Sequence, residues 1–151
     1  MRSRVCVALQ WRIRIFLWDV EHGDVSRPVP GRTPSPVTVR IGMIGAGGVA
    51  QRHARVLAGL PGVQLAGVTD VQPTAAAELA SAYDATVFPD VEALLSAGVD
   101  AAYVCVPPFA HGPAERAVIA AGVPLFVEKP ISVDRVTADE LAKVIAERDL
   151  L

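Results

Sequence analysis

From residue 39 onward, the chain alternates five times between a short apolar segment and a segment whose apolar residues recur at helical spacing. The apolar segments are expected to be strands at 39–44, 63–69, 86–88, 101–106 and 123–127. Short apolar strands separated by helices are typical of a parallel sheet that helices cover on both faces. Because crossovers between parallel strands are right-handed, the predicted fold class is α/β, a doubly wound parallel sheet of the Rossmann type.

The first predicted strand runs directly into GAGGVA at positions 45–50, which opens the first predicted helix. In this G-x-G-x-x-A pattern, Gly45 permits a tight turn, Gly47 lets a diphosphate approach the backbone, and the final alanine lets the helix pack closely. The amides of Gly48 and Val49 would face the phosphate from the positive end of the helix dipole. A strand before the motif and a helix after it indicate a dinucleotide site, and a glycine-rich turn without a ligand is the alternative.

Asp70 ends the second predicted strand, close to the spacing of about 20 residues at which an acid accepts hydrogen bonds from an adenosine ribose. Its carboxylate would repel a 2′-phosphate, and Val71, Gln72 and Pro73 supply no cation that would attract one. The sequence therefore favours NAD as the cofactor, with NADP less favoured. The alternative is a solvated acid that binds nothing.

Two further segments follow strands whose carboxyl ends meet at the same edge of the sheet. Pro107 and Pro108 would form a rigid shelf over the nucleotide, and His111 would donate to a substrate or cofactor oxygen or merely cap a helix. After the fifth strand, Lys129 would exchange a proton with a substrate hydroxyl while hydride leaves the same carbon. The alternative is an exposed ion pair between Lys129 and Glu128 that contributes little.

Taken together, these segments resemble the N-terminal domain of the Gfo/Idh/MocA oxidoreductase family. The resemblance covers residues 39–151 and rests on 41–50, His53, Asp70, Pro107 with His111, and the tripeptide 128–130. It implies hydride transfer between a nicotinamide cofactor and a hydroxyl or carbonyl group of a sugar, inositol or similar substrate. It also implies that Lys129 is the catalytic or substrate-orienting lysine, although His53, by pattern alone, is expected to be a core histidine.

The predicted site combines the pattern and the resemblance. Lys129 and His111 are the predicted catalytic residues, and no metal site is predicted. The predicted cofactor-binding residues are Gly45, Ala46, Gly47, Gly48, Val49, Asp70, Pro107, Glu128, Lys129 and Pro130.

Two departures from the family pattern affect the expected activity. Family members continue into a sixth strand and an α/β substrate domain, so this chain is expected to be truncated, and either to be marginally stable or to self-associate through its exposed sheet edge. Val-Pro-Pro at 106–108 replaces the more usual Thr-Pro-Asn, which puts one side-chain contact to the cofactor in doubt. A non-catalytic nucleotide-binding fragment is therefore an alternative function. A methyltransferase-type domain that binds S-adenosylmethionine is a third, but it gives no reason for residues 128–130.

Residues 1–38 differ in character from the rest of the chain, with Pro- and Gly-rich sequence at 25–36. We expect a disordered extension, an over-long translation from an upstream start, or a transit-like targeting segment. The formal net charge of −2 gives no indication of a nucleic-acid partner, and no apolar run is long enough to cross a membrane. Two cysteines without metal-ligand spacing fit a cytoplasmic location.

Overall fold

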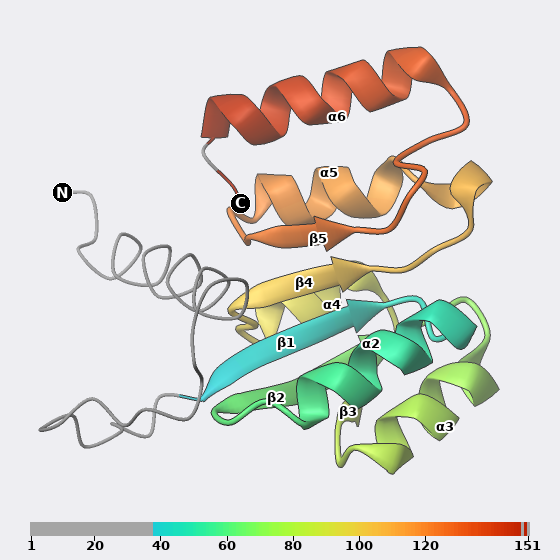
Figure 1. The fold of residues 1–151 in the computed structure, drawn as a ribbon, viewed down its shortest axis with the longest axis vertical. Helices are drawn as coiled ribbons and strands as arrows, with labels where there is room; N and C mark the ends of the chain where they lie inside the picture. Colours follow the sequence, from blue (N-terminus) through green and yellow to red (C-terminus); the bar gives the residue numbers. More distant parts are fainter. Residues whose placement is uncertain (1–37, 149, 151) are drawn as a thin grey trace, which may run out of the picture. The chain divides into compact units, whose positions relative to one another are not determined.

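The computed structural model describes residues 38–148 and 150, and the predictions for residues 1–37 lie outside this range. Five parallel strands form one sheet in the order β3-β2-β1-β4-β5 (Figure 1). They are β1 (Val39–Ile44), β2 (Val63–Thr69), β3 (Thr86–Val87), β4 (Ala101–Val104) and β5 (Leu125–Val127). Successive strands are added outward from β1, first on one side and then on the other. The reversal of direction between β1 and β4 is the point at which such sheets bind ligands.

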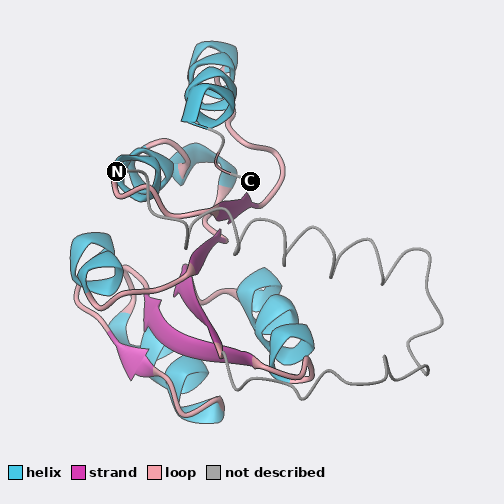
Figure 2. Cartoon of the chain, turned by 90° about the vertical axis from the view of Figure 1, so that its left-hand side faces the viewer, coloured by secondary structure: helices cyan, strands magenta, loops and turns pink. Residues whose placement is uncertain are grey.

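Helices cover both faces of the sheet, as Figure 2 shows, so the predicted doubly wound architecture is confirmed. One core layer lies between β1, β2 and two helices, and it includes Met43 and Leu79. The other core layer lies between β1, β4 and two further helices, and it includes Leu94 and Val118. The first pair is α2 (Gly48–Ala58) and α3 (Pro73–Ala82); the second is α4 (Val91–Ser96) and α5 (Pro113–Ala120).

The last helix, α6 (Arg135–Arg148), packs on α5 (Figure 1). Leu141 is buried there against Ile119. Asp134 caps the start of this helix, because its carboxylate accepts a hydrogen bond from the Thr137 amide at 2.8 Å.

The buried face of α2 differs from the one that apolar periodicity predicts. Val49 and Val56 recur at helical spacing with Leu57, yet they are 44% and 64% exposed. The buried residues are Ala50, Ala54 and Leu57. The glycine turn brings the start of α2 so close to the sheet that methyl side chains fill the space at positions 50 and 54.

Three strands are shorter than predicted, and the third ends one residue early, at Val87. The fourth ends at Val104 and the fifth begins at Leu125. The Cys105 amide still donates to the Ile44 carbonyl at 2.8 Å, so the pairing with β1 extends one residue beyond β4. It stops before Pro107, which has no amide hydrogen to continue it.

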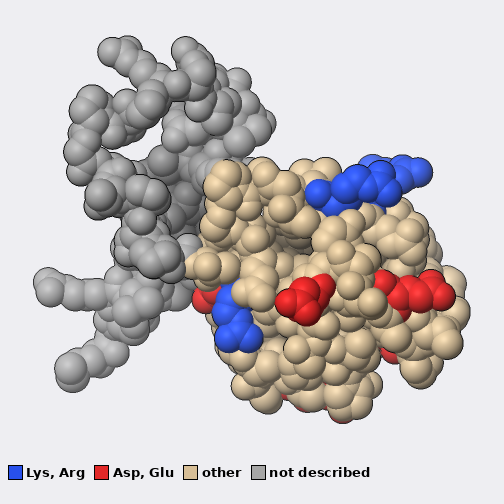
Figure 3. All heavy atoms as spheres, turned by 90° about the horizontal axis from the view of Figure 1, so that it is seen from below, with Lys and Arg blue, Asp and Glu red and all other residues tan. Residues whose placement is uncertain are grey.

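The surface of the described domain carries charges of both signs. In the face drawn in Figure 3, basic and acidic side chains form separate groups. Within residues 38–148, no helix is long and apolar enough to cross a bilayer.

Candidate functional site

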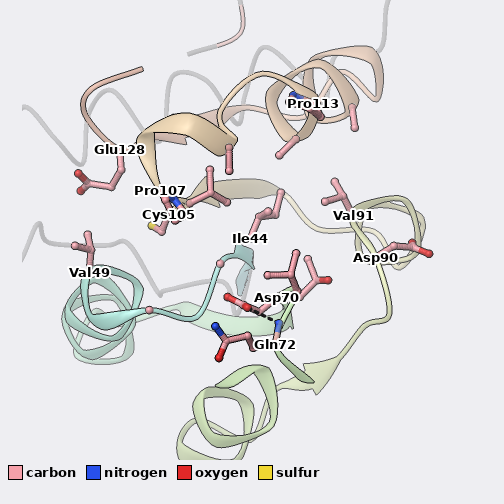
Figure 4. A pocket seen from close by; sticks show the side chains of 18 of the residues that line it. Ile44, Val49, Asp70, Gln72, Asp90, Val91, Cys105, Pro107, Pro113 and Glu128 are labelled. Atoms are coloured by element: carbon pink, nitrogen blue, oxygen red, sulfur yellow. Dashed lines mark hydrogen bonds between the residues drawn. The ribbon is translucent and has the colours of Figure 1, made fainter. Parts of the chain in front are cut away.

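A cavity of about 730 Å³ opens at the carboxyl ends of the strands, where the strand order reverses between β1 and β4 (Figure 4). Eight of the predicted site residues line it: Gly45, Gly47, Gly48, Val49, Asp70, Pro107, Glu128 and Lys129. Three others, Ala46, His111 and Pro130, are not part of the lining. The segments that the sequence predicts at one sheet edge therefore lie around one cavity.

The glycine turn between β1 and α2 has Gly45 and Gly47 for two different reasons. Gly45 has φ +94°, and a Cβ there would lie 2.8 Å from the Cys105 carbonyl carbon, so no side chain fits. Gly47 has φ −68°, and a Cβ there would meet no atom within 4 Å. The first glycine is needed by the fold, and the second keeps open a space that faces the cavity.

The N-terminus of α2 is uncapped within the described residues. Gly47 offers no side chain to its amides, and the first turn holds no acidic residue. The first helical bond runs from the Gln51 amide to the Gly47 carbonyl, at 3.0 Å, so the amides of residues 48–50 lack helical partners. An anionic group seated over Gly47 would satisfy them, and a diphosphate fits this donor set.

Asp70 is fixed by two backbone amides. Its Oδ2 accepts from the Ala46 amide at 2.6 Å, and its Oδ1 accepts from the Gln72 amide at 2.7 Å. The carboxylate therefore ties the end of β2 to the glycine turn, which the sequence did not predict. Each oxygen has a second lone pair, so the group can still accept hydrogen bonds from a ribose.

Charge is unevenly distributed along the cavity. Asp90 and Glu92, at the start of α4, line it with Asp70, and Asp90 also caps α4 through the Ala93 amide. Among the described residues of the lining, Lys129 is the only lysine or arginine. It follows β5, and Figure 4 shows its neighbour Glu128 far from Asp90 across the cavity. Among the charged side chains of the described lining, one end therefore carries only acidic ones, whereas the other carries both Glu128 and Lys129.

His53 joins α2 to the end of β5. Its Nε2 lies 2.6 Å from Glu128 Oε1, and its ring packs edge-on against Phe126 at 5.0 Å between centroids. The side chain is 27% exposed, so His53 is not the core histidine that the pattern favoured. The hydrogen bond from His53, followed by the Lys129 amide 3.1 Å from Oε2, lowers the pKa of Glu128.

The ion pair considered between Glu128 and Lys129 does not form. Within the described part of the chain, no carboxylate oxygen lies within 4.0 Å of the Lys129 amine. Glu128 instead binds His53 and the backbone of Lys129.

His111 lies in the turn between η1 (Pro108–Ala110) and α5, and its side chain is 1% exposed. Its Nδ1 bonds to Glu115 of α5 at 2.5 Å. The residue thus contacts protein on all sides, with no face on the cavity.

The His53–Glu128 contact is expected to depend on pH. A double-mutant cycle of His53→Phe and Glu128→Gln should give a coupling of about 1 kcal/mol at pH 7, the usual size for such a bond. Because the pKa of Glu128 is lowered from 4.5, this stability is present above that value and disappears as pH falls through the lower folded-state pKa. Urea unfolding of the four proteins between pH 3 and 7 measures it. A coupling equal at both ends of this range would contradict the ionised contact.

Comparison with known proteins identifies the domain. A family model described as an oxidoreductase family with an NAD-binding Rossmann fold, Gfo/Idh/MocA, matches residues 39–151. UDP-N-acetylglucosamine 3-dehydrogenase from Acidithiobacillus ferrooxidans is 37% identical over 115 residues, covering 76% of this chain and 36% of that protein. Inositol 2-dehydrogenase from Rhizobium meliloti is 32% identical over 111 residues, covering 74% and 34%. The chain spans about a third of the length of these relatives.

Solved structures of similar proteins contain both forms of the nicotinamide cofactor. GenD2 from gentamicin A biosynthesis, in complex with NAD, has a TM-score of 0.72 and 31% identity, over 83% of this chain and 36% of its own. A variant of KijD10, a 3-ketoreductase from Actinomadura kijaniata in complex with TDP-benzene and NADP, has a TM-score of 0.68 and 28% identity, over 76% and 37%. The chain belongs to the Gfo/Idh/MocA oxidoreductase family, and its described part is the NAD(P)-binding Rossmann domain.

Proposed function

We propose that this domain binds NAD and provides the cofactor side of a hydride transfer to or from a sugar, inositol or similar polyol. The observation that carries the proposal is one cavity bordered by an open glycine turn, an acid after β2 and a lysine after β5. The uncapped end of α2 supports a diphosphate over Gly47.

NAD is proposed over NADP because of the charges around the adenosine end. Asp70 is held where it can accept from the ribose hydroxyls, and Asp90 and Glu92 add negative charge nearby. A 2′-phosphate there would meet three carboxylates and no described lysine or arginine in the same part of the lining.

Lys129 is the proposed catalytic residue. When bound, the nicotinamide supplies or accepts the hydride. In the oxidative direction, Lys129 holds the substrate hydroxyl and takes its proton while the C–H bond gives up a hydride, which leaves a carbonyl group. Glu128, bound by His53 and by the Lys129 amide, orients the backbone that carries the lysine. His111 lies outside the cavity lining, and we propose that it positions the adjacent part of the cavity wall, at residues 107–110.

The substrate class is proposed from the relatives, which are named as dehydrogenases of UDP-N-acetylglucosamine and of inositol. Both names describe oxidation of a ring hydroxyl. The free thiol of Cys105 is compatible with the reducing cytoplasm, where we propose that the protein acts.

The cofactor proposal is tested by thermal unfolding of the chain with NADH, NADPH or S-adenosylmethionine. At ten times its Kd, NADH should stabilise the domain by about 1.4 kcal/mol and raise the Tm by roughly 5 °C. Titration of the nicotinamide fluorescence gives the Kd directly. No response to millimolar NADH, or a larger shift with S-adenosylmethionine, would contradict the proposal.

A further inference from the structure

Glu115 is a fully buried carboxylate that the proposed reaction does not use. It lies in the first turn of α5, where its Oε2 accepts from the Gly112 amide at 2.6 Å and its Oε1 bonds to His111 Nδ1 at 2.5 Å. Burying a carboxylate is unfavourable unless its partners compensate, and an apolar side chain in this place would avoid that cost. The group is best explained by what it holds.

Both partners of Glu115 belong to the segment that connects β4 to α5. This segment is poor in backbone donors, because Pro107 and Pro108 lack an amide hydrogen. Among the described residues, its internal backbone bond runs from the Ala110 amide to the Pro107 carbonyl, at 2.8 Å. Gly112, with φ +121°, turns the chain into α5 and is held by the carboxylate. Glu115 therefore provides contacts that the segment cannot make for itself.

The histidine depends on the same carboxylate. Its Nε2 is buried and has no hydrogen-bond partner among the described residues. The Nδ1 contact to Glu115 is thus the polar anchor that the structure shows for this ring. Removing the carboxylate would leave both nitrogens of the buried His111 ring without a hydrogen-bond partner from the described part of the chain. We expect the segment to rearrange so that the ring can reach another partner or water.

The same segment forms part of the cavity wall. Pro107, Pro108 and Ala110 line the cavity, whereas His111 and Glu115 do not. We propose that Glu115 is a positioning residue for nucleotide binding, which acts through His111 and Gly112 to fix the wall at residues 107–110. This inference rests on the proposed function, because that proposal identifies the ligand as NAD. The position of the wall itself can be measured in the absence of NAD.

Cys105 provides that independent measurement. It lines the cavity two residues before Pro107 and is 9% exposed, and burial raises its pKa to about 12, so its thiol reacts slowly in the folded domain. In a Cys6→Ser background, Cys105 is the single thiol of the chain. Glu115→Ala should increase its rate of modification by dithionitrobenzoate, without cofactor, by about tenfold or more, and raise the Kd for NADH by about tenfold.

Two variants separate positioning from general stability. Glu115→Gln keeps an acceptor for the Gly112 amide and a polar group for His111, so it should restore most of both effects. Leu141→Ala removes a buried side chain from the α5–α6 contact outside the cavity. It should lower the Tm but leave the Cys105 rate and the NADH Kd within twofold of wild type.

If Glu115→Ala does not fold, His111→Ala replaces it and should shift both measurements in the same direction. The inference is overturned if the folded variant stays within twofold of wild type in the Cys105 rate, or if Leu141→Ala gives equal changes. If wild type binds no NADH, the proposed function fails. The Cys105 rates then still decide whether Glu115 holds the wall.

Discussion

Replacing Gly45 by alanine is expected to destabilise the domain by at least about 3 kcal/mol, a large part of the 5–15 kcal/mol typical of a folded domain. The residue has φ +94°, and the new methyl group would overlap the Cys105 carbonyl. Gly45 and Cys105 directly follow β1 and β4, which pair with each other in the middle of the sheet, so their backbones cannot move apart easily. Urea unfolding of wild type and Gly45→Ala measures the loss.

Gly47→Ala is the matched substitution, with the opposite expected result. Its Cβ would point into open space, and its φ of −68° suits any residue, so stability should stay within about 1 kcal/mol of wild type. The methyl group would instead occupy the proposed diphosphate seat. Loss of one or two charge-assisted bonds, each about 1.5–3 kcal/mol, predicts NADH binding at least tenfold weaker.

The pair distinguishes a turn that only folds from one that also binds. Fluorescence titration with NADH and urea unfolding are measured on the same preparations. If Gly47→Ala binds NADH as tightly as wild type, the diphosphate does not lie over the turn. If Gly45→Ala is as stable as wild type, the close approach of β1 and β4 at this point is wrong.

The doubly wound class of the sheet was predictable because it follows from the alternation along the chain. Alternating apolar and helical segments, together with right-handed crossovers, predict parallel strands with helices on both faces, whereas the order of the strands comes from the structure. The faces of the helices were less predictable, since periodicity identifies apolar residues but not how closely a helix approaches the sheet. Ala54 is completely buried and Val56 is 64% exposed for that reason.

The candidate site was predictable where its residues follow strands. Gly45 and Asp70 come directly after two strands, Lys129 comes two residues after a third, and parallel strands bring their carboxyl ends to one edge. The contact between His53 and Glu128 was not, because it joins a helix to a strand end 75 residues away. A histidine one turn into the helix after a glycine turn was the only signal.

The acidic end of the cavity was missed for a different reason. Asp90 and Glu92 read in sequence as the cap and first turn of a short helix, a sufficient explanation of both. Only the fold shows that α4 starts beside the end of β2, which places these carboxylates in the same lining as Asp70. That placement leads to the second large prediction, which concerns cofactor choice.

Val71→Arg is expected to shift the ratio of the NADPH and NADH dissociation constants toward NADPH by about tenfold. Val71 lines the cavity next to Asp70 and is 98% exposed, so an arginine fits there without displacing other side chains. Its guanidinium would attract a 2′-phosphate and form a bidentate contact with it. Adding Asp70→Asn also removes the repulsion between the Asp70 carboxylate and the 2′-phosphate, so the double variant should shift the ratio by about a hundredfold.

The single variant is the cleaner test, because Asp70 has two functions. Its carboxylate accepts from the amides of both Ala46 and Gln72, whereas asparagine offers one oxygen for the two. Asp70→Asn should therefore weaken the binding of both cofactors as the glycine turn loosens, while the ratio still moves toward NADPH. Val56→Arg adds the same charge on the exposed face of α2, outside the cavity lining, and serves as control. If Val71→Arg changes the ratio no more than Val56→Arg does, the adenosine end of the cofactor does not lie beside Asp70.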